Sequence, residues 1–274
     1  MKIYKDQILG GTAKDSQNEK LSLEILEGFA ETYRGKRHPL NQSHDLAKKS
    51  AGYIENIRVI DHPIYEGEYA LVGDVFCDES KLEEVMGGFS VSYLEVIRRN
   101  ESAHEIITYL PYPHYNDLEL LQFLSKQNQP ISVGKWVKKA ADPATVALIG
   151  AAIIFVLQPV WDDLYKTKFA PKIRKFFQSC GQKLKEKEIS CDLAQTVEIN
   201  GHQIQVLLIP DRRKEDLCFS SNYLEQSMQL VHKFAMNHSD SYQIARIHLY
   251  FHSESEGYKI HRVEDAQGTI EHYA

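Results

Sequence analysis

The sequence lacks the short motifs that identify several large enzyme classes. It contains no GxxxxGK[ST] phosphate loop, no GxGxxG dinucleotide fingerprint, no HExxH zinc motif and no GxSxG nucleophile elbow. Its four cysteines form no CxxC pair or other tight metal-binding spacing, which favours free thiols in a reducing compartment. We therefore expect no metal and no cofactor. These cysteines are Cys77, Cys180, Cys191 and Cys218.

The sequence also lacks a basic excess and an N-terminal apolar segment. Its 274 residues include 32 basic and 38 acidic ones, for a formal net charge of −6, whereas nucleic-acid-binding proteins normally carry a positive excess. We therefore expect no nucleic-acid partner. The first residues, MKIYKDQILGGTAKDSQNEK, contain no signal-peptide core, which predicts a cytoplasmic N-terminus. With 43 % apolar residues, the chain can form a globular core.

The pattern of residues 1–129 predicts a β-rich domain. Apolar residues at helical spacing predict a helix over Leu21–Tyr33, which ends before Gly35. Alternating or apolar runs after it predict strands. The predicted strands cover Tyr53–Ile60, Tyr69–Phe76, Gly88–Ile97 and Glu105–Leu110, and two short helices cover Glu79–Met86 and Asp117–Ser125.

Residues 130–187 contain the longest uncharged run of the chain. Pro143–Trp161 spans 19 residues without a charge, close to the roughly 20 apolar residues of a transmembrane helix. We interpret it as a helix that spans or inserts into the cell inner membrane. The alternative is a buried core helix in a cytoplasmic protein, because small residues such as Ala147, Gly150 and Ala151 also suit tight packing.

Basic residues follow this run. Lysines and phenylalanines interleave between Lys166 and Phe177, a pattern typical of a helix on an anionic membrane surface. The charged run Lys183–Glu188 reads as a solvated linker.

Residues 188–274 read as a small α+β domain. Asn200-Gly201 between two apolar runs predicts a β-hairpin with a type I′ turn. A helix over Ser221–Asn237 and strands over Ala245–His252 and Tyr258–Val263 complete a ββαββ pattern. His248 and His252 share one strand face, and we interpret them as exposed strand residues rather than metal ligands.

The segment Pro39–Tyr93 resembles the phage prohead maturation proteases, which have the assemblin-like serine protease fold. Its consecutive parts read PLNQSHDLAKKSAGYIENIRV, EGEYALVGDVF and GGFSVSY. They follow the family's order of a "pL…HD…iG" segment, an "EGL.v.G" strand and a "g.SiGF" strand. The resemblance covers residues 20–118, and its specificity lies in the order and spacing of short elements.

The resemblance implies a catalytic centre. Its nucleophile would be Ser90, its general base His44, and the residue that orients the imidazole His104 or Glu105, with His114 a weaker candidate. A serine hydroxyl needs such a base, and the base needs a group that sets its tautomer. Backbone amides at Gly87 and Gly88 would stabilise the oxyanion.

Two positions depart from the family pattern. The glycine two residues after the serine is Ser92 here, and the phenylalanine is Tyr93. Ser90 and Ser92 point to the same face of a strand, so either could be the nucleophile.

The sequence thus predicts an α+β fold with an assemblin-like N-terminal domain, a central hydrophobic helix and a small C-terminal domain. The expected function is a membrane-tethered serine endopeptidase from a phage, prophage or phage-defence context. Its partners would be a protein or peptide substrate, with phage head proteins as candidates. The alternative is a catalytically inactive assemblin-like binding module coupled to a membrane-inserting helix. The oligomeric state stays open.

Overall fold

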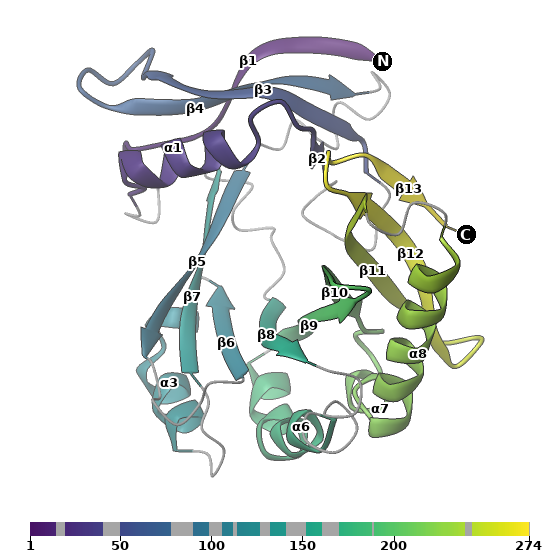
Figure 1. Cartoon of the computed structure of the whole chain (residues 1–274). Helices are drawn as coiled ribbons and strands as arrows, with labels where there is room; N and C mark the ends of the chain where they lie inside the picture. The colour runs from purple at the N-terminus through teal and green to yellow at the C-terminus, as the bar shows by residue number, and fades with distance from the viewer. Residues whose placement is uncertain are drawn as a thin grey trace. The chain divides into compact units, whose positions relative to one another are not determined.

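A computed structural model describes most of the chain, and the described residues form two compact units (Figure 1). The first unit comprises Met1–Tyr93, Val137–Ile149 and Gln267–Thr269, and the second comprises Leu94–Trp136, Gly150–Ala266 and Ile270–Ala274. The described residues are 1–14, 20–40, 50–77, 90–98, 106–111, 114–126, 132–140, 152–160, 170–187, 189–238 and 243–273.

The first unit contains a four-stranded antiparallel sheet with the order β1-β4-β3-β2. Its core lies between one face of this sheet and helix α1 (Leu23–Thr32), and includes Leu26, Leu71 and Val75. The strands are β1 (Lys2–Gly11), β2 (His38–Leu40), β3 (Gly52–Asp61) and β4 (Tyr69–Cys77). The β-rich character predicted for the N-terminal part is confirmed.

Helix α1 forms where the sequence predicted it. The Ser22 hydroxyl accepts a hydrogen bond from the Ile25 amide at 3.3 Å and caps the N-terminus. Leu26 is completely buried on the face that meets the sheet. Gly35, with φ of +68°, takes a left-handed conformation just after the helix, as a C-terminal glycine commonly does.

One row across this sheet brings two backbones unusually close. Gly52 pairs with Leu40 of β2 on one side and with Cys77 of β4 on the other. A Cβ atom at Gly52 would lie 1.8 Å from the carbonyl oxygen of Phe76. Only glycine permits this approach, so Gly52 is required for the pairing of β3 with β4 at this row.

A nine-stranded mixed sheet has the order β13-β12-β11-β10-β9-β8-β6-β7-β5. Strand β5, which starts at Ser90, belongs to this sheet and not to the four-stranded one. The strands are β5 (Ser90–Arg98), β6 (Ile106–Pro111), β7 (Ser132–Ala140), β8 (Ala152–Val160), β9 (Ser190–Ile199), β10 (His202–Ile209), β11 (Ile244–His252), β12 (Gly257–Asp265) and β13 (Ile270–His272).

Helices cover one face of this larger sheet. Their buried side chains form one cluster with alternate residues of the strands, among them Leu193, Val206 and Leu249. The helices are α3 (Leu118–Ser125), α6 (Ala170–Glu186), α7 (Glu215–Cys218) and α8 (Ser221–Asn237), and a 3₁₀ turn, η3, covers His114–Asn116. Three parallel strand pairs are connected through these helices: β6/β7 through α3, β8/β9 through α6, and β10/β11 through α7 and α8.

The predicted hydrophobic helix over Pro143–Trp161 is wrong where the structure describes that segment. Ala152–Val160 forms strand β8, which pairs with β6 on one side and with β9 on the other. A short apolar run does not distinguish an interior strand from a buried helix by periodicity, and Ile153, Ile154 and Val156 are β-branched. Among the described residues, no helix has the length and apolar character needed to cross a membrane.

The basic amphipathic stretch also has a different role from the predicted one. Its Phe176 and Phe177 lie on α6 and are buried in the core of the second unit. The interpretation of these side chains as a membrane-facing surface is therefore wrong. Lys183–Glu186 forms the end of α6, and Leu184 is buried, so this run is helical rather than a linker.

The C-terminal elements match the sequence predictions. Asn200 and Gly201 have φ of +53° and +76°, as a type I′ turn requires, and they join β9 to β10. Helix α8 and strands β11 and β12 form at the expected places. All four cysteines are buried, and none of them forms a disulfide. The helix predicted over Glu79–Met86 lies outside the described residues.

The close approach at Gly52 leads to a stability prediction. Replacement of Gly52 by alanine should lower the free energy of unfolding by about 3 kcal/mol, because β3 and β4 must move apart to admit the methyl group. Chemical denaturation measures this change. Gly257→Ala is the matched control, since a Cβ atom there would meet only the Ser255 carbonyl, at 3.9 Å. Equal stability of both variants would contradict the close approach.

Candidate functional site

The residues of the predicted peptidase centre fall mostly outside the described part of the chain. Ser90 is the first residue of β5, and Ser92 lies in the same strand. His44, Gly87, Gly88, His104 and Glu105 lie outside the described residues. His114, the weaker candidate, lies in η3, where burial lowers the pKa of its imidazole.

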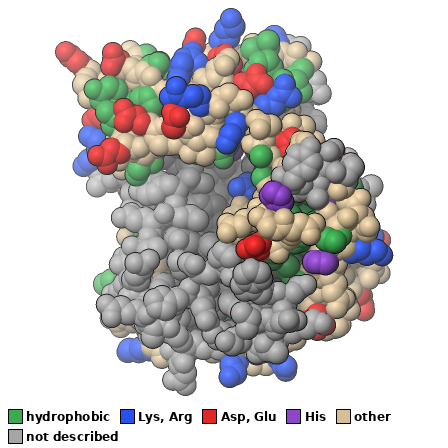
Figure 2. Space-filling view, viewed as in Figure 1, with side chains coloured by type: hydrophobic (Ala, Val, Ile, Leu, Met, Phe, Trp, Pro, Cys, Tyr) green, Lys and Arg blue, Asp and Glu red, His purple; other side chains and the backbone are tan. Residues whose placement is uncertain are grey.

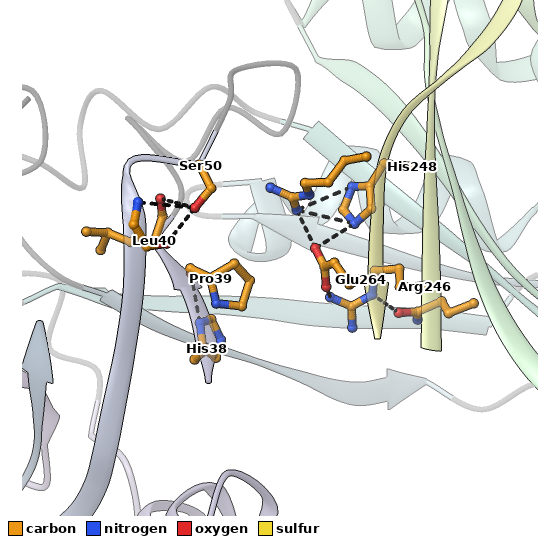
Figure 3. A network of polar contacts seen from close by, with 10 residues as sticks. His38, Pro39, Leu40, Ser50, Arg246, His248 and Glu264 are labelled. Atoms are coloured by element: carbon orange, nitrogen blue, oxygen red, sulfur yellow. Dashed lines mark hydrogen bonds and ion pairs between the residues drawn. The ribbon is translucent and has the colours of Figure 1, made fainter. Parts of the chain in front are cut away.

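The residues that flank two of these segments lie in one row of the four-stranded sheet. Leu40, just before the segment that contains His44, pairs with Gly52. Gly52 also pairs with Cys77, the last described residue before the segment that leads to Ser90. Ser50 holds this row together, because its hydroxyl lies 3.1 Å from the carbonyl oxygen of Leu40 and 2.6 Å from that of Gly52 (Figure 3).

The second unit carries a buried ionic network on the sheet face opposite its helices. The network follows the strand register, because Arg246 pairs with Gln205 and Glu264, and His248 pairs with Arg262. Figure 3 shows the side chains of His248 and Arg246 beside the Glu264 carboxylate. His248 is 1 % exposed, Arg262 0 % and Glu264 5 %.

Each oxygen of the Glu264 carboxylate is engaged. One oxygen lies 3.0 Å from Nε2 of His248 and 2.7 Å from a guanidinium nitrogen of Arg262. The other lies 3.1 Å from Arg246, whose Nε donates to the Gln205 side chain at 2.6 Å. The buried carboxylate is therefore stabilised by charge-assisted contacts.

Burial sets the protonation state of this network. Burial lowers the pKa of His248 to about 4, more than the Glu264 hydrogen bond raises it, so the imidazole is neutral at pH 7. Burial alone would raise the pKa of Glu264, but the hydrogen bond from His248 and the two arginines lower it to about 2. Nε2 of His248 lies 3.0 Å from the Glu264 carboxylate and 3.2 Å from a guanidinium nitrogen of Arg262, so the ring contacts both charged groups.

The pair of Glu264 and His248 has the form of a carboxylate that orients an imidazole, but it is sealed from solvent. A general base must reach the proton that it abstracts, and a ring that is 1 % exposed does not. We therefore assign a structural role, and not a catalytic one, to this network. The interpretation of His248 as an exposed residue is wrong, and the sequence signal that was missed is the repeat of charged residues two apart, at Arg262 and Glu264.

Thiol chemistry is disfavoured at three buried cysteines of the second unit. Burial raises the pKa of Cys180 and Cys191 and raises that of Cys218 to about 12. The thiolate is the reactive form, so these side chains are poor nucleophiles at neutral pH. Arg212 lies near Cys191 but contacts its carbonyl oxygen at 2.9 Å and the Asp192 carboxylate at 2.8 Å.

Comparisons with known proteins add no family assignment. No family model matches the sequence, and searches of curated proteins and of solved structures returned no match. Within the ranges that the structure describes, no three His, Cys, Asp or Glu side chains group as metal ligands do.

The network predicts how stability depends on pH. The folded-state pKa of His248 lies below that of the unfolded chain, so protonation of the unfolded chain destabilises the fold as pH falls from 6.5 to about 4. The expected loss is about 3 kcal/mol. The folded-state pKa of Glu264 also lies below that of the unfolded chain, so the fold loses further stability as pH falls from 4.5 to about 2. Unfolding by urea across this pH range measures both.

His248→Gln should flatten the first part of this curve, because the amide does not titrate and can still donate to Glu264. His202→Gln, at an exposed position of β10, is the control and should keep the parent slope. An unchanged slope for His248→Gln would show that another group causes the loss of stability.

The same network predicts unequal roles for its two arginines. Arg262→Met should destabilise the fold by about 3–5 kcal/mol, because it removes the buried cation at 2.7 Å from Glu264. Arg246→Met should have a smaller effect, because the Arg246 side chain is 39 % exposed. Thermal unfolding at pH 7 compares them, and an equal loss would refute the ranking.

Proposed function

We propose that the chain is a serine endopeptidase of the prohead-protease type. Ser90 is the nucleophile, His44 the general base, and His104 or Glu105 orients the imidazole. The amides of Gly87 and Gly88 stabilise the oxyanion. The substrate is a protein or peptide, and phage head proteins are candidates for it.

The observation that carries this proposal is the row formed by Leu40, Gly52 and Cys77. The segment with His44 starts and ends beside this row, and the segment that leads to Ser90 starts from it. A base and a nucleophile far apart in the sequence must be brought together by the fold, and segments that leave neighbouring strands at one row are one way to do so.

At two positions that match the family pattern, the backbone of the described residues explains why the residue is glycine. Gly52, in the "iG" element, permits the close approach of β3 to the Phe76 carbonyl. Gly67, in the "EG" element, has φ of +76° in the turn between β3 and β4. Both support an ordered match over a chance one.

The chemistry follows from the residue types. His44 takes the proton of the Ser90 hydroxyl as the oxygen attacks a peptide carbonyl, and then returns a proton to the leaving amine. Water attacks the resulting acyl-enzyme with the same base. The raised pKa values of the buried thiols favour the serine over a cysteine of the second unit as the nucleophile.

Labelling with a fluorophosphonate tests the nucleophile. Ser90→Ala and His44→Ala should each lower labelling and peptide cleavage by roughly a thousandfold or more. The double variant should be little worse than either single one, because nucleophile and base act as a unit. Intact-mass measurement identifies the labelled residue.

Ser92→Ala is the matched control, since it removes a hydroxyl two residues along the same strand. It should retain most of the activity. If only Ser92→Ala loses activity, the nucleophile is Ser92 and not Ser90. If no variant changes labelling or cleavage, the proposal fails and the inactive binding module replaces it.

A further inference from the structure

A shallow groove in the first unit lies between α1 and β3. It has a volume of about 740 Å³. Ala30, Ile57 and Val59 give it apolar walls, and charged residues of α1 stand along one side. Figure 2 shows acidic side chains gathered over α1. The remaining lining residues are Glu24, Glu27, Gly28, Glu31, Arg34 and Arg58.

The fold of the first unit does not require a glycine at position 28 of this groove. Gly28 lies inside α1, where glycine lowers helix stability relative to alanine. A Cβ atom at this position would meet nothing within 4 Å, and its φ is not positive. Neither close packing nor backbone conformation therefore requires glycine here. Because glycine has no side chain, the groove stays open at this position.

The charges along the groove are unequally paired. Glu31 pairs with Arg34, and Arg58 pairs with Asp6 of β1. Among the described residues, no cation pairs with Glu24 or Glu27, and both are exposed. The groove thus presents two carboxylates, one helical turn apart, beside an apolar wall.

We propose that this groove binds an extended basic peptide segment, with an apolar side chain against Ile57 and Val59 and Lys or Arg side chains facing Glu24 and Glu27. This inference rests on the proposed peptidase function and names its substrate class. Opposite charge and apolar contact act together in such a site. The same acidic lining disfavours nucleic-acid phosphates and anionic lipid headgroups.

The test uses the full chain with Ser90→Ala, so that binding is measured without cleavage. Two labelled ten-residue peptides serve as probes, one alternating leucine with lysine and one alternating leucine with glutamate. Fluorescence anisotropy should show binding of the lysine peptide, weakened by added salt, and at least tenfold weaker binding of the glutamate peptide.

Two sets of variants locate the site. Glu24→Gln combined with Glu27→Gln should weaken binding of the lysine peptide about fivefold, as expected for two exposed ion pairs. Glu254→Gln combined with Glu256→Gln removes the same charge from exposed positions of the second unit and should change binding less than twofold. Gly28→Leu should weaken binding at least tenfold, whereas its melting temperature should equal or exceed that of the parent.

Three outcomes would each overturn the inference. They are equal binding of both peptides, unchanged binding of the lysine peptide in Gly28→Leu, and an equal loss of its binding in the two double Glu→Gln variants. Failure of the peptidase proposal is a separate result, because cleavage by the Ser90-containing chain is measured apart from binding. If the chain binds the lysine peptide but never cleaves it, the peptide-binding proposal stands and the peptidase proposal fails.

Discussion

The close approach of β3 to β4 at Gly52 is the constraint on which the first unit depends. It sets the register of the row that runs from Leu40 through Gly52 to Cys77. A side chain at this position would push the two central strands apart, and the register of the flanking strands depends on theirs. The unit therefore combines a fixed sheet with segments that start from one row, and binding and catalytic residues are often held on a rigid scaffold in this way.

In the second unit, a buried ionic network constrains the strand register. Its helices cover one face of a large sheet, and on the opposite face buried charged side chains contact one another. On that face Glu264 contacts His248 and pairs with Arg246 and Arg262. A buried ionic network of this kind adds little stability over an apolar packing, but it penalises any shift of register that separates its members.

Local patterns predicted most of the individual elements, because capping, turn chemistry and periodicity act over a few residues. Ser22 before α1, Asn200-Gly201 in the hairpin and the apolar stripe of α8 are examples. Long-range pairing was not predictable from these signals. The apolar run of β8 fits a helix equally well, and nothing local assigns β5 to the larger sheet. For the same reason the sequence did not place His248 in a buried network. The peptidase residues came from a resemblance in order and spacing, which sets no distances between side chains.

The Asn200-Gly201 turn has a consequence for the order of folding. It joins β9 to β10 with two residues, so these strands meet after a very short loop closure, whereas α6 separates β8 from β9 and α8 separates β10 from β11. Hairpins close within microseconds, and parallel pairs that need a crossover form more slowly because a longer loop must be ordered first. Loop-closure entropy thus favours the β9–β10 hairpin as the first strand pair of the second unit to form. The parallel strands β8 and β11 add to its two edges later, and those edges stay open to wrong pairing until they do.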